Sequence, residues 1–380
     1  MSQIKLIKLL SLCTNLLFWN SIWLLYYLKF VNNQQIGTIE LIVFFTAQIF
    51  EIPTGFIGDK VGWKKSVLFG LPFLAIGNIV MGAIPSFNAF LVSGLIMGIG
   101  DAFLSGSVQS LQYHTAKSES YDFSKLQKEI NKYKAIGTVI ATLVGGLIFM
   151  VDIHVPYYLR AIGFLAAFVV TLFIKDIEIV NKVDIKSEKK KLKENIKNYL
   201  TIFKKLISIR EILGISIVMI VCQFVYQYLY DFSLIRIGLD SAALTILMVS
   251  AYIISAIYFH FHDKVEFLSR YKYIIYLSTL VLVLINIRFI LIIISIIRPT
   301  FYQQIENESE KIILDNSKAE NSASNLSVIN FLRGLIYPIG IFVVGGLLDK
   351  GFFMQIMLVL ILIFIVGLFI KNFKLKNYEK

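Results

Sequence analysis

Long apolar runs separated by short charged stretches dominate this chain. An α-helix crosses the hydrocarbon of a bilayer with about 20 mostly apolar residues. Ten runs are long enough, at 8–30, 38–58, 66–85, 87–116, 133–151, 156–174, 211–237, 241–262, 327–348 and 352–372. A further run, 271–304, is too long for one span, and we split it at the polar residues Asn286 and Arg288. The pattern predicts twelve membrane-spanning helices.

Composition supports this interpretation. The chain is 57% hydrophobic and 16% charged, against roughly 45–50% and about 25% for soluble domains. Disordered chains lack such apolar content. The two cysteines, Cys13 and Cys222, lie in apolar runs and indicate no disulfide scaffold. We therefore expect an all-α integral membrane protein.

The basic residues predict the orientation. With the N-terminus inside, inside segments hold 30 of the 37 basic residues and outside segments hold five: Lys29, Arg160, Arg236, Arg288 and Lys350. This asymmetry follows the positive-inside rule, so both termini and the stretch 175–210 are expected to be cytoplasmic. A basic run beside membrane helices, such as 186–197, is typical of contact with anionic lipid. We expect no nucleic-acid partner.

The stretch 175–210 divides the chain into two six-helix bundles, 1–174 and 211–380, with itself as a cytoplasmic linker. Short matches relate these halves. Asp59-Lys60-Val61 recurs as Asp263-Lys264-Val265, and Val144-Gly145-Gly146-Leu147 recurs as Val344-Gly345-Gly346-Leu347. Duplicated halves are common in transporters, whose substrate sites lie between the repeats.

The turn after the second span carries a motif. Gly55, Asp59, Lys60, Gly62 and Lys64 follow Glu51-Ile-Pro-Thr. This resembles the loop 2–3 motif of the major facilitator superfamily, with Trp63 in the usual place of an arginine, and the preceding residues are similar to those of bacterial drug or multidrug exporters. The resemblance implies two pseudo-symmetric six-helix bundles and a conformational-switch role for these five residues. The alternative is an ordinary charged turn.

Glycines mark the fifth span, at Gly137, Gly145 and Gly146. The spacing resembles the superfamily's antiporter motif, although Ala141 and Thr142 replace its Gly-Pro. The alternative is close helix packing by small residues.

Ionisable residues inside spans are unfavourable and are candidates for function. The candidates for coupling are Asp101, Glu51, Asp231, Arg298 and Arg333. Asp101 is the first choice as proton carrier, with Arg298 as its state-dependent or permanent partner. Polar and aromatic residues at helical spacing predict a substrate cavity lined by Asn15, Trp19, Trp23, Ser105, Gln109, Gln223, Tyr226, Gln227 and Tyr230.

The sequence shows no metal-binding spacing, P-loop or catalytic constellation, so we expect no enzyme, cofactor or metal. The favoured function is proton-coupled export of small amphipathic compounds by a monomer in a bacterial cytoplasmic membrane. The partners are then the lipid bilayer, a small-molecule substrate and protons. The alternatives are uptake of a small nutrient and a membrane receptor or scaffold that transports nothing.

Thiol labelling tests the orientation. After replacement of Cys13 and Cys222, a single cysteine at Ser187 should resist membrane-impermeant maleimide in intact cells and react after permeabilisation, because 175–210 is expected inside. A cysteine at Lys350, expected outside, serves as the matched control. Labelling of position 187 in intact cells would invert the topology.

Overall fold

A computed structural model describes residues 2–176, 204, 206, 208–261, 266–316 and 322–372, except some side chains within helices. Its regular elements are helical throughout this described part. The elements are α1 (Gln3–Cys13), α2 (Trp23–Tyr27), α3 (Asn33–Val61), α4 (Trp63–Ala83), α5 (Phe87–Leu104), α6 (Ser107–Ser118), α7 (Phe123–Ile148), α8 (Val155–Leu172), α10 (Arg210–Phe224), η1 (Val225–Leu229), α11 (Tyr230–Arg236), α12 (Ser241–His260), α13 (Glu266–Arg270), α14 (Lys272–Ile285), α15 (Arg288–Asp315), α16 (Ser322–Asp349) and α17 (Phe353–Asn372). Each predicted span has a helical counterpart.

The sequence predicted one continuous helix for the first span, 8–30, and this prediction is wrong. Helix α1 ends at Cys13, α2 begins at Trp23, and residues 14–22 form irregular turns. The Asn15 side chain contributes to the interruption, because its amide takes the Ser11 carbonyl while its backbone N–H turns to Leu12 O. The Thr14 hydroxyl donates to Leu10 O at 3.0 Å, and the Asn15 amide donates to Ser11 O at 2.8 Å.

Two other spans also depart from a regular helix. The fourth span breaks between α5 and α6 at Ser105 and Gly106, where Gly106 has a φ of 69°. In the seventh, the π-helical turn η1 joins α10 to α11.

The split of 271–304 is confirmed, because α14 is capped by the left-handed residue Asn286 and α15 begins at Arg288.

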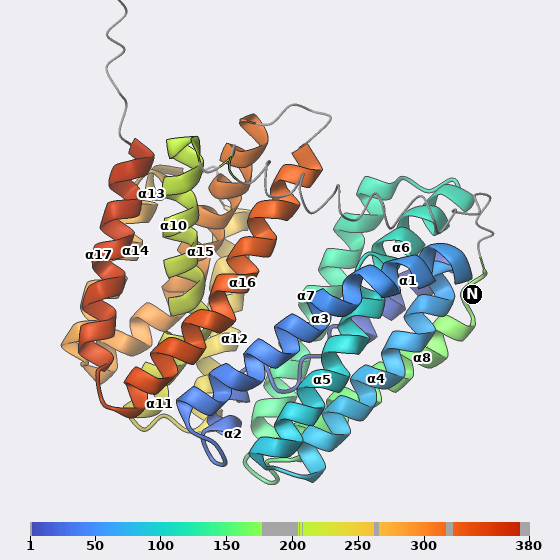
Figure 1. The fold of residues 1–380 in the computed structure, drawn as a ribbon, viewed down its shortest axis with the longest axis horizontal. Coiled ribbons are helices and arrows are strands. Elements are labelled where there is room, and N and C mark those ends of the chain that lie inside the picture. Colours follow the sequence, from blue (N-terminus) through green and yellow to red (C-terminus); the bar gives the residue numbers. More distant parts are fainter. Residues whose placement is uncertain are drawn as a thin grey trace, which may run out of the picture. The chain divides into compact units, whose positions relative to one another are not determined.

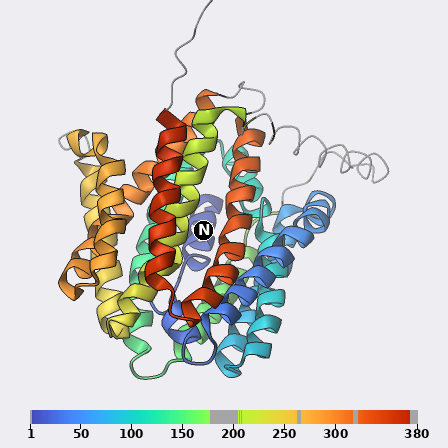
Figure 2. The same cartoon turned by 60° about the vertical axis from the view of Figure 1, so that its left-hand side comes forward.

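The helices form two compact units (Figure 1). The first comprises Met1–Val183 with Asp240–Val249, and the second comprises Asp184–Leu239 with Ser250–Lys380. The first half of α12 therefore groups with the N-terminal helices. In the second unit, the yellow-green α10 lies beside the red α17 in both views (Figure 1, Figure 2).

Outward-facing apolar side chains fit a membrane environment. Within the described part, six helical stretches are long and apolar enough to span a bilayer: Trp63–Ala83, Phe87–Ser118, Val155–Leu172, Arg210–Arg236, Ser241–His260 and Phe353–Asn372. The most apolar stretch of helix α17 has a mean hydropathy of 3.0, yet only 33% of that stretch is buried within the protein. Such a surface is suited to contact with lipid tails rather than water.

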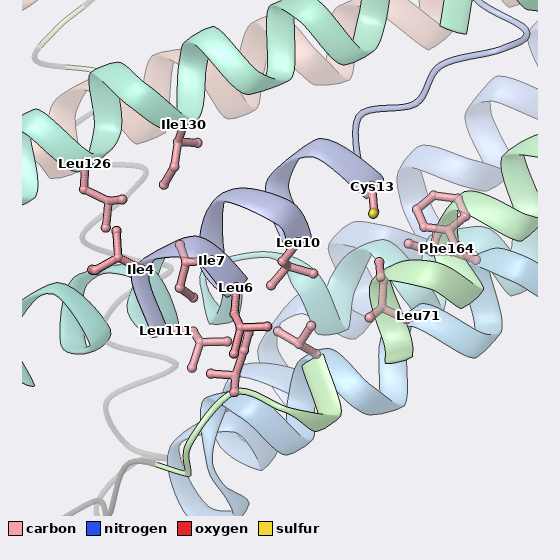
Figure 3. Close-up of a cluster of buried hydrophobic side chains, with 14 of the residues drawn as sticks. Ile4, Leu6, Ile7, Leu10, Cys13, Leu71, Leu111, Leu126, Ile130 and Phe164 are labelled. Carbon is pink, nitrogen blue, oxygen red and sulfur yellow. The ribbon is translucent and has the colours of Figure 1, made fainter. Parts of the chain in front are cut away.

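Helix α1 is anchored in the core of the first unit. Ile7 and Leu10 are fully buried, and they pack in one cluster with Leu71, Leu126 and Ile130 of neighbouring helices. Figure 3 shows these side chains around α1, whose helical ribbon ends beside Cys13 and continues as an irregular trace. The apolar contacts hold α1 firmly, so the irregular segment starts from a fixed point.

A carboxylate outside the predicted spans forms ion pairs in each unit. Lys8 pairs with Glu129, and the Lys8 hydrogen bond holds the pKa of the Glu129 carboxyl below its ordinary value. In the second unit, Glu308 pairs with Lys272 at 2.8 Å and with Lys371 at 2.9 Å. Burial opposes ionisation of Glu308, but the two lysines outweigh it and lower its pKa. These pairs join α1 to α7, and α14 and α17 to α15.

Candidate functional site

The irregular segment 14–22 offers backbone carbonyls that no helical ladder occupies. The Arg160 guanidinium of α8 donates from Nη1 to Leu16 O at 3.1 Å. The Thr138 hydroxyl of α7 donates to Asn15 O at 3.2 Å. Both carbonyls also accept a backbone N–H within the segment, Asn15 O from Leu17 and Leu16 O from Phe18. Side chains of two other helices therefore add a second hydrogen bond to each carbonyl and tie the segment to α7 and α8.

The glycines of α7 make room for this segment. A Cβ added at Gly145 would lie 1.8 Å from Phe18 O, and one at Gly146 would lie 1.7 Å from Thr245 Oγ1 of α12. At Gly137 the nearest atom is a Leu12 methyl carbon at 2.8 Å. These positions admit no side chain without movement of their neighbours. The three glycines whose spacing resembles the antiporter motif thus allow close packing of α7 against its neighbours.

Polar contacts extend from the end of the irregular segment to α7 and α12. Ser21 Oγ and Thr245 Oγ1 lie 2.8 Å apart, and the Asn20 amide donates to Thr142 Oγ1 at 3.4 Å. Both threonines are fully buried. These hydrogen bonds fix the entry into α2 together with the buried side chains of Ile22 and Leu24.

Two acids of the first unit lie within the predicted spans 38–58 and 87–116 and are exposed. Asp101 lies in the last turn of α5, and its electrostatic partner is Arg160. Glu51 lies in α3 and accepts a hydrogen bond from the Ser105 hydroxyl at 3.0 Å. An exposed carboxylate in an apolar helix is strongly unfavourable against lipid. These two acids are therefore suited to a hydrated path.

Arg160 corrects the sequence analysis, which counted it among the outside residues. Helix α8 begins at Val155, so Arg160 lies more than one turn inside it and is 7% exposed. Its guanidinium lies 4.0 Å from the centroid of the Phe164 ring. The side chain is part of the bundle rather than of an outer loop.

Glu40 is a further acid that the sequence analysis missed. It lies in α3, within the predicted span 38–58, and is half-buried. It interacts electrostatically with Tyr27, which is 5% exposed. A search of every acid inside a predicted span would have found it.

In the second unit the π-helical turn η1 has its own buried arginine. Arg298 of α15 is 5% exposed and donates from Nη1 to Val225 O at 3.2 Å. Its guanidinium lies 3.6 Å from the Tyr230 ring centroid and 4.8 Å from that of Tyr226. The Tyr226 ring also stacks on Tyr302, with centroids 4.5 Å apart. We call Arg298, Tyr226, Tyr230 and Tyr302 the arginine–tyrosine cluster.

The charge of Arg298 is only partly compensated. Burying an unpaired ion costs several kcal/mol, whereas a hydrogen bond to a charged group returns about 1.5–3 kcal/mol and a desolvated cation–π contact about 2 kcal/mol. Arg298 forms no ion pair with a carboxylate within the described ranges. Its Nε is buried and has no partner in the same part of the chain.

Arg333 of α16 borders a small cavity of about 160 Å³. It is 7% exposed and donates from Nη2 to the hydroxyls of Ser216 and Ser309. Gln223 and Phe224 of α10 line the cavity opposite Gly340 of α16. The walls are almost entirely apolar, so the cavity suits an apolar group.

The loop 2–3 motif is described in part. Gly62 separates α3 from α4 with a φ of 111°, a conformation that favours glycine. The Lys64 ammonium donates to Leu172 O at the end of α8, at 2.9 Å. Trp63 stacks on His114, with ring centroids 4.1 Å apart. Gly55, Asp59 and Lys60 lie in α3, but the surroundings of Gly55 and the side chains of Asp59 and Lys60 are outside the described part, as is the repeat at 263–265.

The other predicted cavity residues do not form one helical face. Trp19 lies in the irregular segment, and Trp23 packs edge-on against Tyr27, so the expected stripe of Asn15, Trp19 and Trp23 is interrupted. Others lie on α6, η1 and α11: Gln109 is exposed, Gln227 is half-buried, and Tyr230 donates to Leu291 O. The coupling candidate Asp231 interacts electrostatically with Tyr226 and Tyr230.

Comparison with known sequences identifies relatives of the chain. A family model described as Major Facilitator Superfamily matches residues 9–302. The uncharacterized MFS-type transporter YxaM of Bacillus subtilis is 24% identical over 159 residues, covering 41% of this chain and 39% of the relative. The uncharacterized MFS-type transporter MJ1560 of Methanocaldococcus jannaschii is 25% identical over 225 residues, covering 57% of each. The matches thus span 39% and 57% of the lengths of these relatives.

Solved structures support the fold. The nucleoside transporter NupG has a TM-score of 0.79 at 14% identity, with 98% of this chain and 100% of that chain covered. A peptide transporter POT in complex with sulfate has a TM-score of 0.70 at 15% identity, with 97% and 94% covered. The predicted architecture of twelve membrane helices in two six-helix bundles is confirmed.

The contact of Gly145 with the irregular segment can be tested by thermal unfolding. Gly145→Ala should destabilise the purified protein by about 1–3 kcal/mol, since the added Cβ forces the backbone of Phe18 to move. Gly340→Ala is the matched control, because its Cβ would meet only the Phe224 ring, at 3.3 Å. Equal melting temperatures for both variants would contradict the close approach.

Proposed function

Because the chain belongs to the Major Facilitator Superfamily, we propose that it is a proton-coupled exporter of small amphipathic compounds in a bacterial cytoplasmic membrane. Membership makes it a multi-pass membrane transporter. Export, proton coupling and the substrate class are our inference. The proposed orientation keeps both termini in the cytoplasm.

The observation that carries the proposal is the exposed Asp101 in the apolar helix α5. A carboxylate there needs water, a proton or a cation, and Arg160 is the cation that interacts with it. Arg160 also binds Leu16 O in the irregular segment. Protonation of Asp101 would release electrostatic attraction on Arg160 and thereby alter the support of that segment.

Such a link is what coupling requires, because a proton shifts a conformational equilibrium only if it binds the two states differently. Glu51 is the second acid on this path, one hydrogen bond from Ser105 at the break between α5 and α6. Amide side chains and aromatic rings lie near the interrupted first span and near the π-helical turn of the seventh span, and this combination favours an amphipathic substrate. The loop 2–3 sequence, with its likeness to exporters, supports the outward direction.

Uptake of a polar nutrient is the second candidate. The matched solved structures are titled as nucleoside and peptide transporters, and a fold of this type serves either direction. Proteoliposomes with an imposed pH gradient separate the candidates: an exporter accumulates amphipathic dyes in inside-out vesicles that are acidic inside, whereas an importer accumulates nucleosides or dipeptides in right-side-out vesicles that are acidic outside.

Asp101→Asn should abolish accumulation driven by the pH gradient and leave exchange of substrate across the membrane measurable, because the variant cannot carry the proton. Asp315→Asn, which removes an exposed acid at the end of α15, is the matched control and should transport normally. Accumulation by Asp101→Asn at the level of the control would rule out Asp101 as the proton carrier.

A further inference from the structure

The arginine–tyrosine cluster holds a buried cation that forms no ion pair within the described part of the second unit, and the carboxylate at the cluster, Glu306, is bound by the Tyr302 hydroxyl at 3.4 Å rather than by Arg298. Arg298 is almost fully enclosed, yet it contacts only one backbone carbonyl and the faces of two rings. A guanidinium carries five N–H donors in a planar fork. One edge of this fork is used by Val225 O, while Nε on the other edge has no partner.

The π-helical turn creates this arrangement. In η1 the carbonyl of Val225 accepts both the Tyr230 N–H across the π-helical turn and the Arg298 guanidinium, and Tyr226 follows it in the turn. Insertions of this kind in helices are frequent at functional sites. The Tyr230 hydroxyl donates to Leu291 O at 2.6 Å, which fixes its ring below the guanidinium. Tyr226, in contrast, is half-buried and covers the cluster from the less enclosed side.

We propose that the arginine–tyrosine cluster binds the anionic group of the transported compound, and that this compound is an aromatic or otherwise apolar monocarboxylate. The free edge of Arg298 matches the two oxygens of a carboxylate. A single cation favours one negative charge over two. The stacked Tyr226 and Tyr302 provide aromatic faces 4.5 Å apart beside it, where a substrate ring would replace one stacking partner. The inference rests on the proposed transport function and specifies its substrate class.

Three dansyl probes test the charge preference on the full chain in nanodiscs: dansylglycine is anionic, dansylamide is neutral, and dansylcadaverine is cationic. We expect dansylglycine to bind about tenfold more tightly than dansylamide, as one charge-assisted bidentate contact provides. Dansylcadaverine should bind most weakly. Fluorescence titration gives the three dissociation constants.

Arg298→Gln should remove the preference for the anion, and Arg298→Lys should retain only part of it, because an ammonium has no planar edge. Arg236→Gln is the matched control: that arginine lies over the Phe353 ring at 5.2 Å in α11 and should leave the preference unchanged. Thermal unfolding shows whether each variant is folded. If Arg298→Gln does not fold, the comparison of Arg298→Lys with the wild type is the test.

Equal binding of dansylglycine and dansylamide by the wild type would overturn the inference, and so would an anion preference that survives Arg298→Gln in a folded protein. The second result would leave Arg298 with the structural role of supporting η1. Transport measured on the same preparations keeps the two proposals separate. Anion-selective binding without transport driven by a pH gradient contradicts the proposed function alone, whereas coupled transport without anion preference contradicts this inference alone.

Discussion

The absence of water in the hydrocarbon imposes the constraint on which this structure depends: every backbone polar group released from a helix needs a partner within the protein. The chain interrupts its first span at residues 14–22 and inserts the turn η1 into its seventh. Each distortion leaves carbonyl groups outside the regular α-helical ladder: Leu16 O accepts from Phe18 N, and Val225 O accepts from Tyr230 N across the π-helical turn. In each unit a buried arginine donates to one of them, Arg160 to Leu16 O and Arg298 to Val225 O.

The same constraint explains why charged residues persist at membrane depth. Arg160 and Arg298 are unfavourable as isolated charges, but each offsets part of that cost by satisfying backbone and by contacting an aromatic ring, that of Phe164 or Tyr230. A charge held in this way remains sensitive to an added proton or anion. Distorted helices in transporters are the places where ions and substrates bind, so the structural supports are also the candidates for coupling and recognition.

The sequence predicted the number and approximate limits of the spans, which depend on hydropathy. It did not predict the irregular backbone within a span, which depends on individual side-chain contacts. Twelve spans and the split at Asn286 follow from apolar length and one polar interval. The break after Cys13 was not predicted, because Leu16, Leu17 and Phe18 keep the run apolar. Its local signal is the polar group Thr14, Asn15, Asn20 and Ser21: the Asn15 amide takes Ser11 O, and the Asn20 and Ser21 side chains bond to other helices.

The sequence was also a poor guide to the surroundings of individual candidate residues. Arg160 was counted outside although the predicted span 156–174 contains it, and its burial within α8 places it in the bundle. The glycines of α7 were found by their spacing, but their contacts with Phe18 O and Thr245 Oγ1 depend on tertiary packing. No pattern in the sequence specifies which carbonyl an arginine reaches.

Hydrogen exchange measured by mass spectrometry on the protein in nanodiscs tests the interrupted first span most directly. Amides of residues 14–22 should exchange about tenfold or more faster than those of residues 137–148 in α7, because they lack a continuous ladder. Arg160→Gln should widen this difference, since the replacement removes a support of the segment. Protection of residues 14–22 equal to that of α7 would show a continuous helix and contradict the account.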